Sequence, residues 1–229
     1  MSSYLKEVYK LKSSYIFRRK KSRFSSKLKK KRGNNVYKSF VLESKCIFVH
    51  IPKSAGKSIA LAVYGDDKPG HYLLEDYQYF NPEVYARSFK FAFVREPVSR
   101  FISAYNFLAS GGSTSGDLFF KEKIIDRYED INSFVELWLA NGNLLTKEHF
   151  VPQVYFTHIG GEMGLDFLGY FETLSSDYTK LQEHIHDLPD LPCVNQGTRN
   201  ETTISPRTRA LLKELYKADY AAFSTGSPW

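Results

Sequence analysis

The chain has 229 residues and a formal net charge of +7, and 42% of its residues are hydrophobic. This length allows one α/β domain with a full core. Two cysteines, Cys46 and Cys193, are too few and too far apart in sequence for a disulfide framework or a zinc site. No segment reaches the ~18 consecutive apolar residues that a membrane span requires.

Positive charge is concentrated at the start of the chain. Residues 1–32 carry a net charge of +12 and the remainder carries −5. Such basic blocks are usually solvated and flexible, so we expect a flexible basic arm over residues 1–35 and a single domain over residues 36–229. The arm has two interpretations. It either contacts an anionic membrane surface, an acidic glycan or nucleic acid, or it is a solvated tail with no dedicated partner.

The first residues also bear on location and on partners. No apolar stretch follows the first charges, so we expect no secretory signal. The simplest expectation is a cytoplasmic protein that could lie at the membrane surface through its arm. We expect no specific nucleic-acid partner.

The first predicted strand, residues 45–50, leads into a small-residue loop and then into a predicted helix over residues 57–64. Unpaired N–H groups of the first helical turn and the helix dipole favour an anion at such a junction. Lys53 and Lys57 add positive charge, and Gly56 lets the backbone approach an oxyanion closely.

This loop matches only half of the P-loop of nucleotide triphosphatases. Gly56-Lys57-Ser58 fits the second half of that motif, but Ile51 stands where its first glycine is required. The loop is therefore a poor nucleotide-triphosphatase loop. The alternative is an ordinary strand–turn–helix whose lysines face solvent.

A second junction follows the predicted strand 89–94, which ends at Arg95, and a helix is predicted over residues 97–109. Apolar residues recur along this helix at helical spacing, at Val98, Phe101, Ile102, Tyr105 and Leu108. Ser103 lies on another face, where it and Arg95 could reach one anion, and the planar guanidinium suits phosphate. The alternative is a surface salt bridge of Arg95, for example with Glu96.

The rest of the chain continues the alternation. Glycines over residues 111–116 mark a loop. One further strand is predicted over residues 166–171, and further helices over 131–140, 175–187 and 206–223. Alternation of this kind predicts an α/β fold with three α/β/α layers around a central parallel sheet. Ligands of such sheets bind outside the carboxyl ends of the strands, where both loops would lie.

The two junctions together resemble the sulfotransferases that use 3'-phosphoadenosine-5'-phosphosulfate (PAPS). The loop from Pro52 to Ser58 is similar to their 5'-phosphosulfate loop, and Arg95-x-Pro-x-x-Arg-x-x-Ser103 to their 3'-phosphate motif. The carbohydrate branch, which includes heparan, chondroitin and dermatan enzymes and bacterial relatives, is the most similar. Weaker pieces support it, at Gly70-His71, at His149-Phe150-x-Pro152-Gln153, at Gly169-x-Phe171-Glu172-Thr173-Leu174, and between Leu215 and Phe223.

The resemblance spans residues 45–224 and implies a P-loop-like sulfotransferase fold, a PAPS-dependent transfer to a hydroxyl of a carbohydrate, and no metal. It implies that the 5'-phosphosulfate is held by Lys53, Ser54, Ala55, Gly56, Lys57 and Ser58. It implies that Arg95 and Ser103 hold the 3'-phosphate. Lys57 stands where many relatives have Thr or Ser, which leaves its role open.

The same resemblance suggests the catalytic groups. Lys53 would stabilise the leaving phosphate, and His71 would take the proton of the acceptor hydroxyl, because a histidine after a glycine does so in the glycosaminoglycan enzymes. Glu75 is the alternative base.

Two other functions stay open. A P-loop-type kinase of a small molecule or sugar would place a metal-binding aspartate at a strand end, where this chain has Arg95 instead. A non-catalytic module could bind acidic glycan or nucleic acid through the arm.

Overall fold

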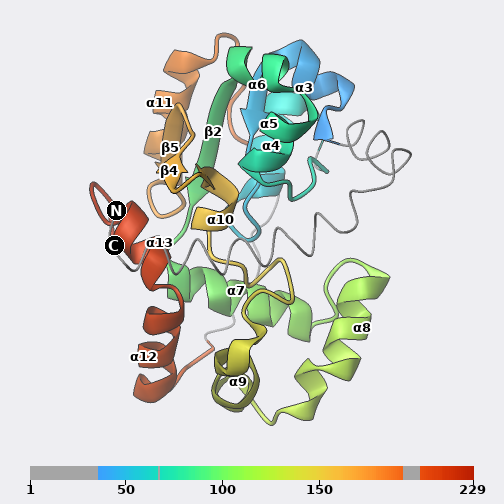
Figure 1. Cartoon of the computed structure of the whole chain (residues 1–229), viewed down its shortest axis with the longest axis vertical. Helices are drawn as coiled ribbons and strands as arrows, with labels where there is room; N and C mark the ends of the chain where they lie inside the picture. Colours follow the sequence, from blue (N-terminus) through green and yellow to red (C-terminus); the bar gives the residue numbers. More distant parts are fainter. Residues whose placement is uncertain (1–35, 67, 193–201) are drawn as a thin grey trace. The chain divides into compact units, whose positions relative to one another are not determined.

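The computed structural model describes residues 36–66, 68–192 and 202–229. They belong to two compact units (Figure 1). The first takes its described residues from Met1–Val94 and Gln153–Asn195, and the second from Arg95–Pro152 and Gln196–Ser227. The predicted arm lies outside the described residues. The prediction of a single domain over residues 36–229 stays a prediction.

A parallel sheet of three strands organises the first unit. The strands are β1 (Cys46–Phe48), β2 (Phe89–Val94) and β5 (Phe167–Tyr170), in the order β1-β2-β5. Phe48 pairs with Phe91, and Val94 pairs with Tyr170. All three predicted strands are present, and the α/β prediction is confirmed. The first is shorter than the predicted 45–50, although the N–H of Val49 still donates to the carbonyl of Phe91 at 2.9 Å.

Aromatic side chains join the sheet to two helices. Phe48, Phe91 and Phe93 belong to one buried cluster with residues of α4 (Gly56–Tyr64) and α11 (Leu174–His184). This cluster fixes the start of α4 beside the end of β1. The first unit also contains α3 (Ser39–Ser44), α5 (Leu74–Phe80), α6 (Pro82–Arg87), α10 (Val154–Thr157) and the hairpin β3 (His158–Ile159) with β4 (Glu162–Met163).

The helix α7 (Pro97–Ala109) is the centre of the second unit and has the predicted bounds. Pro97 occupies its first turn, and the carboxylate of Glu96 caps it by accepting from the N–H of Ser99 at 2.6 Å. Its predicted apolar stripe is confirmed, since four of its members are buried and Ile102 packs against them. Around α7 lie α8 (Ser115–Lys123), the 3₁₀ turn η1 (Ile125–Arg127), α9 (Ile131–Phe134) and the π-helix η2 (Val135–Asn143).

The predicted helix over residues 131–140 is not one α-helix. It changes to a π-helix at Val135 and ends at Asn141 and Gly142, whose backbone angles are not helical; Gly142 has φ 86°. Amides of Asn141 and Asn143 donate to the carbonyls of Leu137 and Trp138. Side chains thus satisfy carbonyl groups that a continuing helix would have bonded.

The predicted helix over residues 206–223 is two helices, α12 (Pro206–Leu215) and α13 (Lys217–Phe223). Tyr216 separates them. Its side chain is buried, and its hydroxyl donates to the carbonyl of Phe150 at 2.7 Å. A contact with a distant segment therefore accompanies the break in a helix that the local pattern continues.

The predicted glycine loop 111–116 ends at Thr114, because α8 begins at Ser115, and Asp117 ties this loop to its surroundings. Its carboxylate accepts from the N–H groups of Ser113 and Thr114 and from the ammonium of Lys147 at 2.6 Å. Burial alone would raise the pKa of Asp117, but the hydrogen bonds and the charge of Lys147 outweigh burial and lower it to about 2.

We expect Asp117 to make stability depend on pH in acid. Because its folded pKa lies below its ordinary value of 3.8, its contribution is complete above about pH 5 and is lost as the pH falls through 2. The loss should be about 2 kcal/mol. Urea unfolding at pH 6 and pH 2.5 measures it. Asp117→Asn should remove this part of the dependence, whereas Asp126→Asn, in an exposed ion pair with Lys121, should retain it. Equal pH dependence in all three proteins would contradict the assignment.

None of the helices in the described part of the chain has the length and apolar character needed to cross a bilayer.

Candidate functional site

The loop between β1 and α4 has an unusual backbone. Lys53 and Ala55 both have positive φ, at 71° and 59°, although neither is glycine. Left-handed residues of this kind cost of order 1–3 kcal/mol each, and they gather at functional sites. Left-handed residues in a turn can direct successive N–H groups toward one point and so form a concave anion site. The strained backbone therefore makes this loop a candidate anion site.

Ser54 lies between these two residues and is almost fully buried, with 1% of its surface exposed. Its hydroxyl has no hydrogen-bond partner among the residues that the structure describes. A buried polar group without a partner is costly. An oxygen of a bound anion could accept from this hydroxyl.

The N-terminus of α4 completes the loop. The helix begins at Gly56, one residue before the predicted start, and Ala55 provides no side-chain cap. Its first turn has no acidic residue, and it contains Lys57, which is exposed, and Ser58, which is half-buried. The N–H groups and the dipole of this end favour a bound anion.

Gly56 has a steric role that the sequence does not reveal. A Cβ atom at this position would lie 1.8 Å from both Cδ2 and Nε2 of His50. The His50 ring therefore packs directly against the backbone of Gly56, and no larger residue fits. The predicted close approach of an oxyanion to Gly56 is not tested by this contact.

His71 lies beside the same loop. Its Nδ1 is 3.2 Å from the carbonyl oxygen of His50, and the two rings have centroids 4.3 Å apart. A carbonyl only accepts, so Nδ1 carries the hydrogen and the lone pair of a neutral ring lies on Nε2. This is the tautomer that a general base at Nε2 needs. Gly70, with φ 82°, supplies the turn before it, and Glu75 lies in the first turn of α5.

In the second unit, the guanidinium of Arg95 lies along the first turns of α7. Its Nε and Nη2 donate to the hydroxyl of Ser99 at 3.1 and 2.9 Å. Ser103 is half-buried and lies four residues further on, so it shares a helix face with Ser99. Ser99 was not among the predicted site residues. Its spacing from Ser103 was the signal for it.

Arg100, the second arginine of the same motif, is fully buried. Its Nη1 and Nη2 donate to the carbonyls of His149 and Val151 at 3.1 and 2.8 Å, and its guanidinium lies 5.6 Å from the ring centre of Tyr216. No carboxylate of the described residues forms an ion pair with Arg100. Arg100 therefore shapes the segment 149–151, whose His149 stacks on Phe107 at 5.3 Å.

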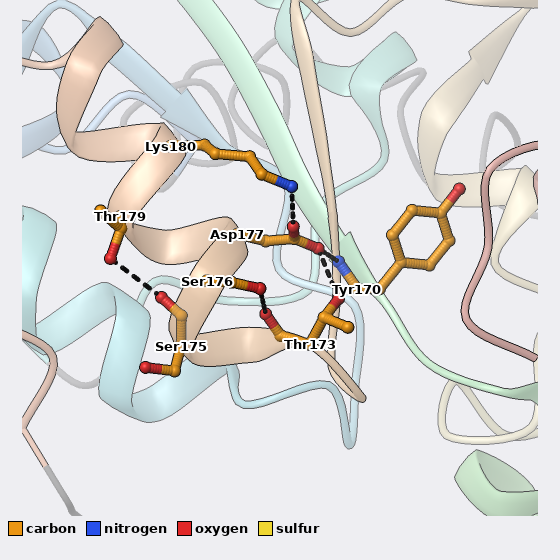
Figure 2. Close-up of polar contacts among 7 residues, drawn as sticks. All are labelled: Tyr170, Thr173, Ser175, Ser176, Asp177, Thr179 and Lys180. Carbon is orange, nitrogen blue, oxygen red and sulfur yellow. Dashed lines mark hydrogen bonds and ion pairs between the residues drawn. The ribbon is translucent and has the colours of Figure 1, made fainter.

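A third strand-to-helix junction lies between β5 and α11. Figure 2 shows Asp177 at its centre: the carboxylate accepts from the N–H of Tyr170 at 2.9 Å, the hydroxyl of Thr173 at 2.8 Å and the ammonium of Lys180 at 2.8 Å. Burial alone would raise the pKa of Asp177, but these three donors outweigh burial, and the pKa lies below its ordinary value. Asp177 was also not predicted, and it acts by fixing the backbone that follows β5.

The predicted site residues fall into two groups. Residues 53–58 and His71 belong to the first unit, which brings His71 to the loop through His50. Arg95 and Ser103 belong to the second unit. Within the described residues, no group of three or more His, Cys, Asp or Glu side chains could hold a metal ion.

Comparison with known proteins gives one match. The sequence model of the Sulfotransferase family matches residues 41–224, which include both groups. No significant match was found among curated proteins or among solved structures.

Proposed function

The chain belongs to the sulfotransferase family, and from this premise we propose that it transfers a sulfuryl group from PAPS to a hydroxyl group of a carbohydrate. The proposal includes a P-loop-like arrangement with three α/β/α layers. Its main support is the loop after β1, where two left-handed residues flank the buried hydroxyl of Ser54 before an uncapped helix N-terminus.

We assign the two ends of the donor to the two cationic segments. Lys53, Ser54, Ala55, Gly56, Lys57 and Ser58 would bind the 5'-phosphosulfate, and Arg95 and Ser103 would bind the 3'-phosphate. One observation supports the second of these assignments. Ser99 orients the guanidinium of Arg95 along the helix face that carries Ser103.

The transfer itself requires a base and a stabilised leaving group. The acceptor hydroxyl oxygen attacks sulfur, and the bond from sulfur to the 5'-phosphate oxygen breaks with its electron pair remaining on the phosphate. Nε2 of His71 takes the hydroxyl proton, since its Nδ1 hydrogen is directed at the carbonyl of His50. Lys53 offsets the charge that develops on the leaving phosphate. The alternative base is Glu75.

The basic arm is assigned to the acceptor side or to a surface. Its net charge of +12 over residues 1–32 would attract an anionic glycan or membrane. A cytoplasmic enzyme with peripheral membrane contact is consistent with this charge.

The donor assignment is tested by nucleotide binding. We expect 3'-phosphoadenosine-5'-phosphate, the product left after transfer, to stabilise the protein without added metal. At a concentration of 100 Kd the gain should be about 2.7 kcal/mol, measured as a shift in thermal unfolding. Stabilisation by ATP with magnesium, and none by the bisphosphate, would contradict the proposal and favour the kinase.

A further inference from the structure

The ring of His50 lies next to both the donor-binding loop and the candidate base. His50 follows β1 and is buried, with 8% of its surface exposed. Its ring touches the backbone of Gly56, where a Cβ would come within 1.8 Å. The ring of His71 is also a neighbour, at 4.3 Å between centroids, and Phe48 stacks on His50 at 5.7 Å.

The two parts of His50 therefore contact His71 in different ways. The main-chain carbonyl accepts from Nδ1 of His71 at 3.2 Å and selects the tautomer. The ring packs against the first residue of α4 and lies next to the ring of His71. Protein interiors are close-packed, so the filled position of the His50 ring leaves the ring of His71 and the start of α4 little room to shift.

We propose that His50 is a positioning residue that fixes the distance from the base His71 to the donor-binding loop. This inference depends on the proposed function. A base must lie within hydrogen-bond reach of the proton that it takes, and a displacement of 1 Å can cost about 100-fold in rate. Gly56 contributes to the same positioning, because only glycine leaves room for the His50 ring.

Substitution of His50 should therefore slow the chemical step more than it weakens donor binding. We expect His50→Ala to lower kcat about 10- to 100-fold. The KM for PAPS and the calorimetric affinity for 3'-phosphoadenosine-5'-phosphate should change less than about 3-fold, since His50 is not among the residues assigned to the donor and its ring packs against the backbone of Gly56. His184→Ala is the matched control. It removes a histidine stacked on Phe89, the first residue of β2, and should leave kcat within about 2-fold.

A double-mutant cycle with His71→Ala provides the decisive test. Rates are measured as transfer of radiolabelled sulfate from PAPS to the most reactive acceptor in a panel of polysaccharides, glycolipids and small alcohols. If His50 acts through His71, His50→Ala lowers kcat in the natural protein and has no further effect in His71→Ala. If His50→Ala is unfolded, His50→Gln, which keeps a planar side chain, takes its place.

The outcomes separate this inference from the function on which it depends. Equal losses from His50→Ala in both backgrounds would overturn the positioning role and leave His71 as the base. A His71→Ala variant with unchanged kcat would overturn the base assignment, and the role of His50 with it. An effect of His50→Ala on the affinity for the bisphosphate alone would make His50 part of the donor site and would also overturn the inference.

Discussion

Lys53→Ala is expected to reduce sulfuryl transfer by at least about 100- to 1,000-fold, the loss found when one donor to a developing negative charge is removed. Lys53 lies in the loop that follows β1 and is half-buried. In the proposed reaction its ammonium faces the phosphate whose charge increases as the bond to sulfur breaks. The loss should therefore appear mainly in kcat.

The fold should survive this substitution. Lys53 has φ 71°, and alanine meets the same steric cost as lysine in that conformation. The free energy of unfolding should change by less than about 0.5 kcal/mol.

The matched control is Lys45→Ala. Lys45 is exposed, also has positive φ, at 54°, and precedes β1 at its opposite end. Lys45→Ala removes the same charge from the same kind of backbone conformation. Any loss of activity due to charge or strain alone would therefore appear in both variants. Near-normal turnover of a folded Lys53→Ala protein would show that Lys53 does not act in the transfer.

Arg100→Ala is expected to be the most destabilising substitution of the second unit, at about 3–5 kcal/mol. Arg100 is fully buried and donates to two main-chain carbonyls, those of His149 and Val151. Alanine would leave both carbonyls without these donors, at about 1–3 kcal/mol each. It would also leave a cavity beside Tyr216, because the long side chain fills space as well as carrying charge.

Denaturant unfolding measures this effect. Arg209→Ala is the control, since Arg209 is exposed on α12, and it should change stability by less than about 0.5 kcal/mol. Arg100→Lys should fall between the two, because an ammonium cannot reproduce the fork of the guanidinium. If Arg100→Ala unfolds at the same midpoint as Arg209→Ala, the buried arginine does not hold the segment 149–151.

Local signals explain what the sequence predicted well. The strand over residues 89–94 and the helix over residues 97–109 have the predicted bounds. Pro97 in the first turn and the apolar stripe that follows it are local signals, because they can be recognised from neighbouring residues of the sequence. The start of α4 was predicted to within one residue for the same reason, since a small-residue loop precedes an apolar run.

Long-range contacts explain what the sequence could not predict. Nothing near Tyr216 shows that its hydroxyl bonds to Phe150, which lies 66 residues away and accompanies the break between α12 and α13. The contact of His71 with His50 spans 21 residues. The steric need for glycine at position 56 comes from the His50 ring, and the approach of an oxyanion to Gly56 stays a prediction.

Arg100 carried a signal that sequence reasoning did not use. It shares a helix face with Ala104 and Leu108, four and eight residues further on, and both are buried. An arginine on an apolar face is a candidate for a buried side chain that donates to main-chain carbonyls. Asp177 similarly follows Thr173 by four residues at the start of α11, a spacing that allows the observed hydrogen bond.

The central claim is that two cationic segments bind opposite ends of one nucleotide. Calorimetry with two ligands tests it directly: 3'-phosphoadenosine-5'-phosphate, and adenosine 5'-phosphate, which lacks the 3'-phosphate. We predict that Arg95→Ala weakens binding of the bisphosphate by about 10- to 100-fold, the contribution of charge-assisted hydrogen bonds. The affinity for adenosine 5'-phosphate should stay unchanged. Equal weakening of both ligands, or of neither, would contradict the claim.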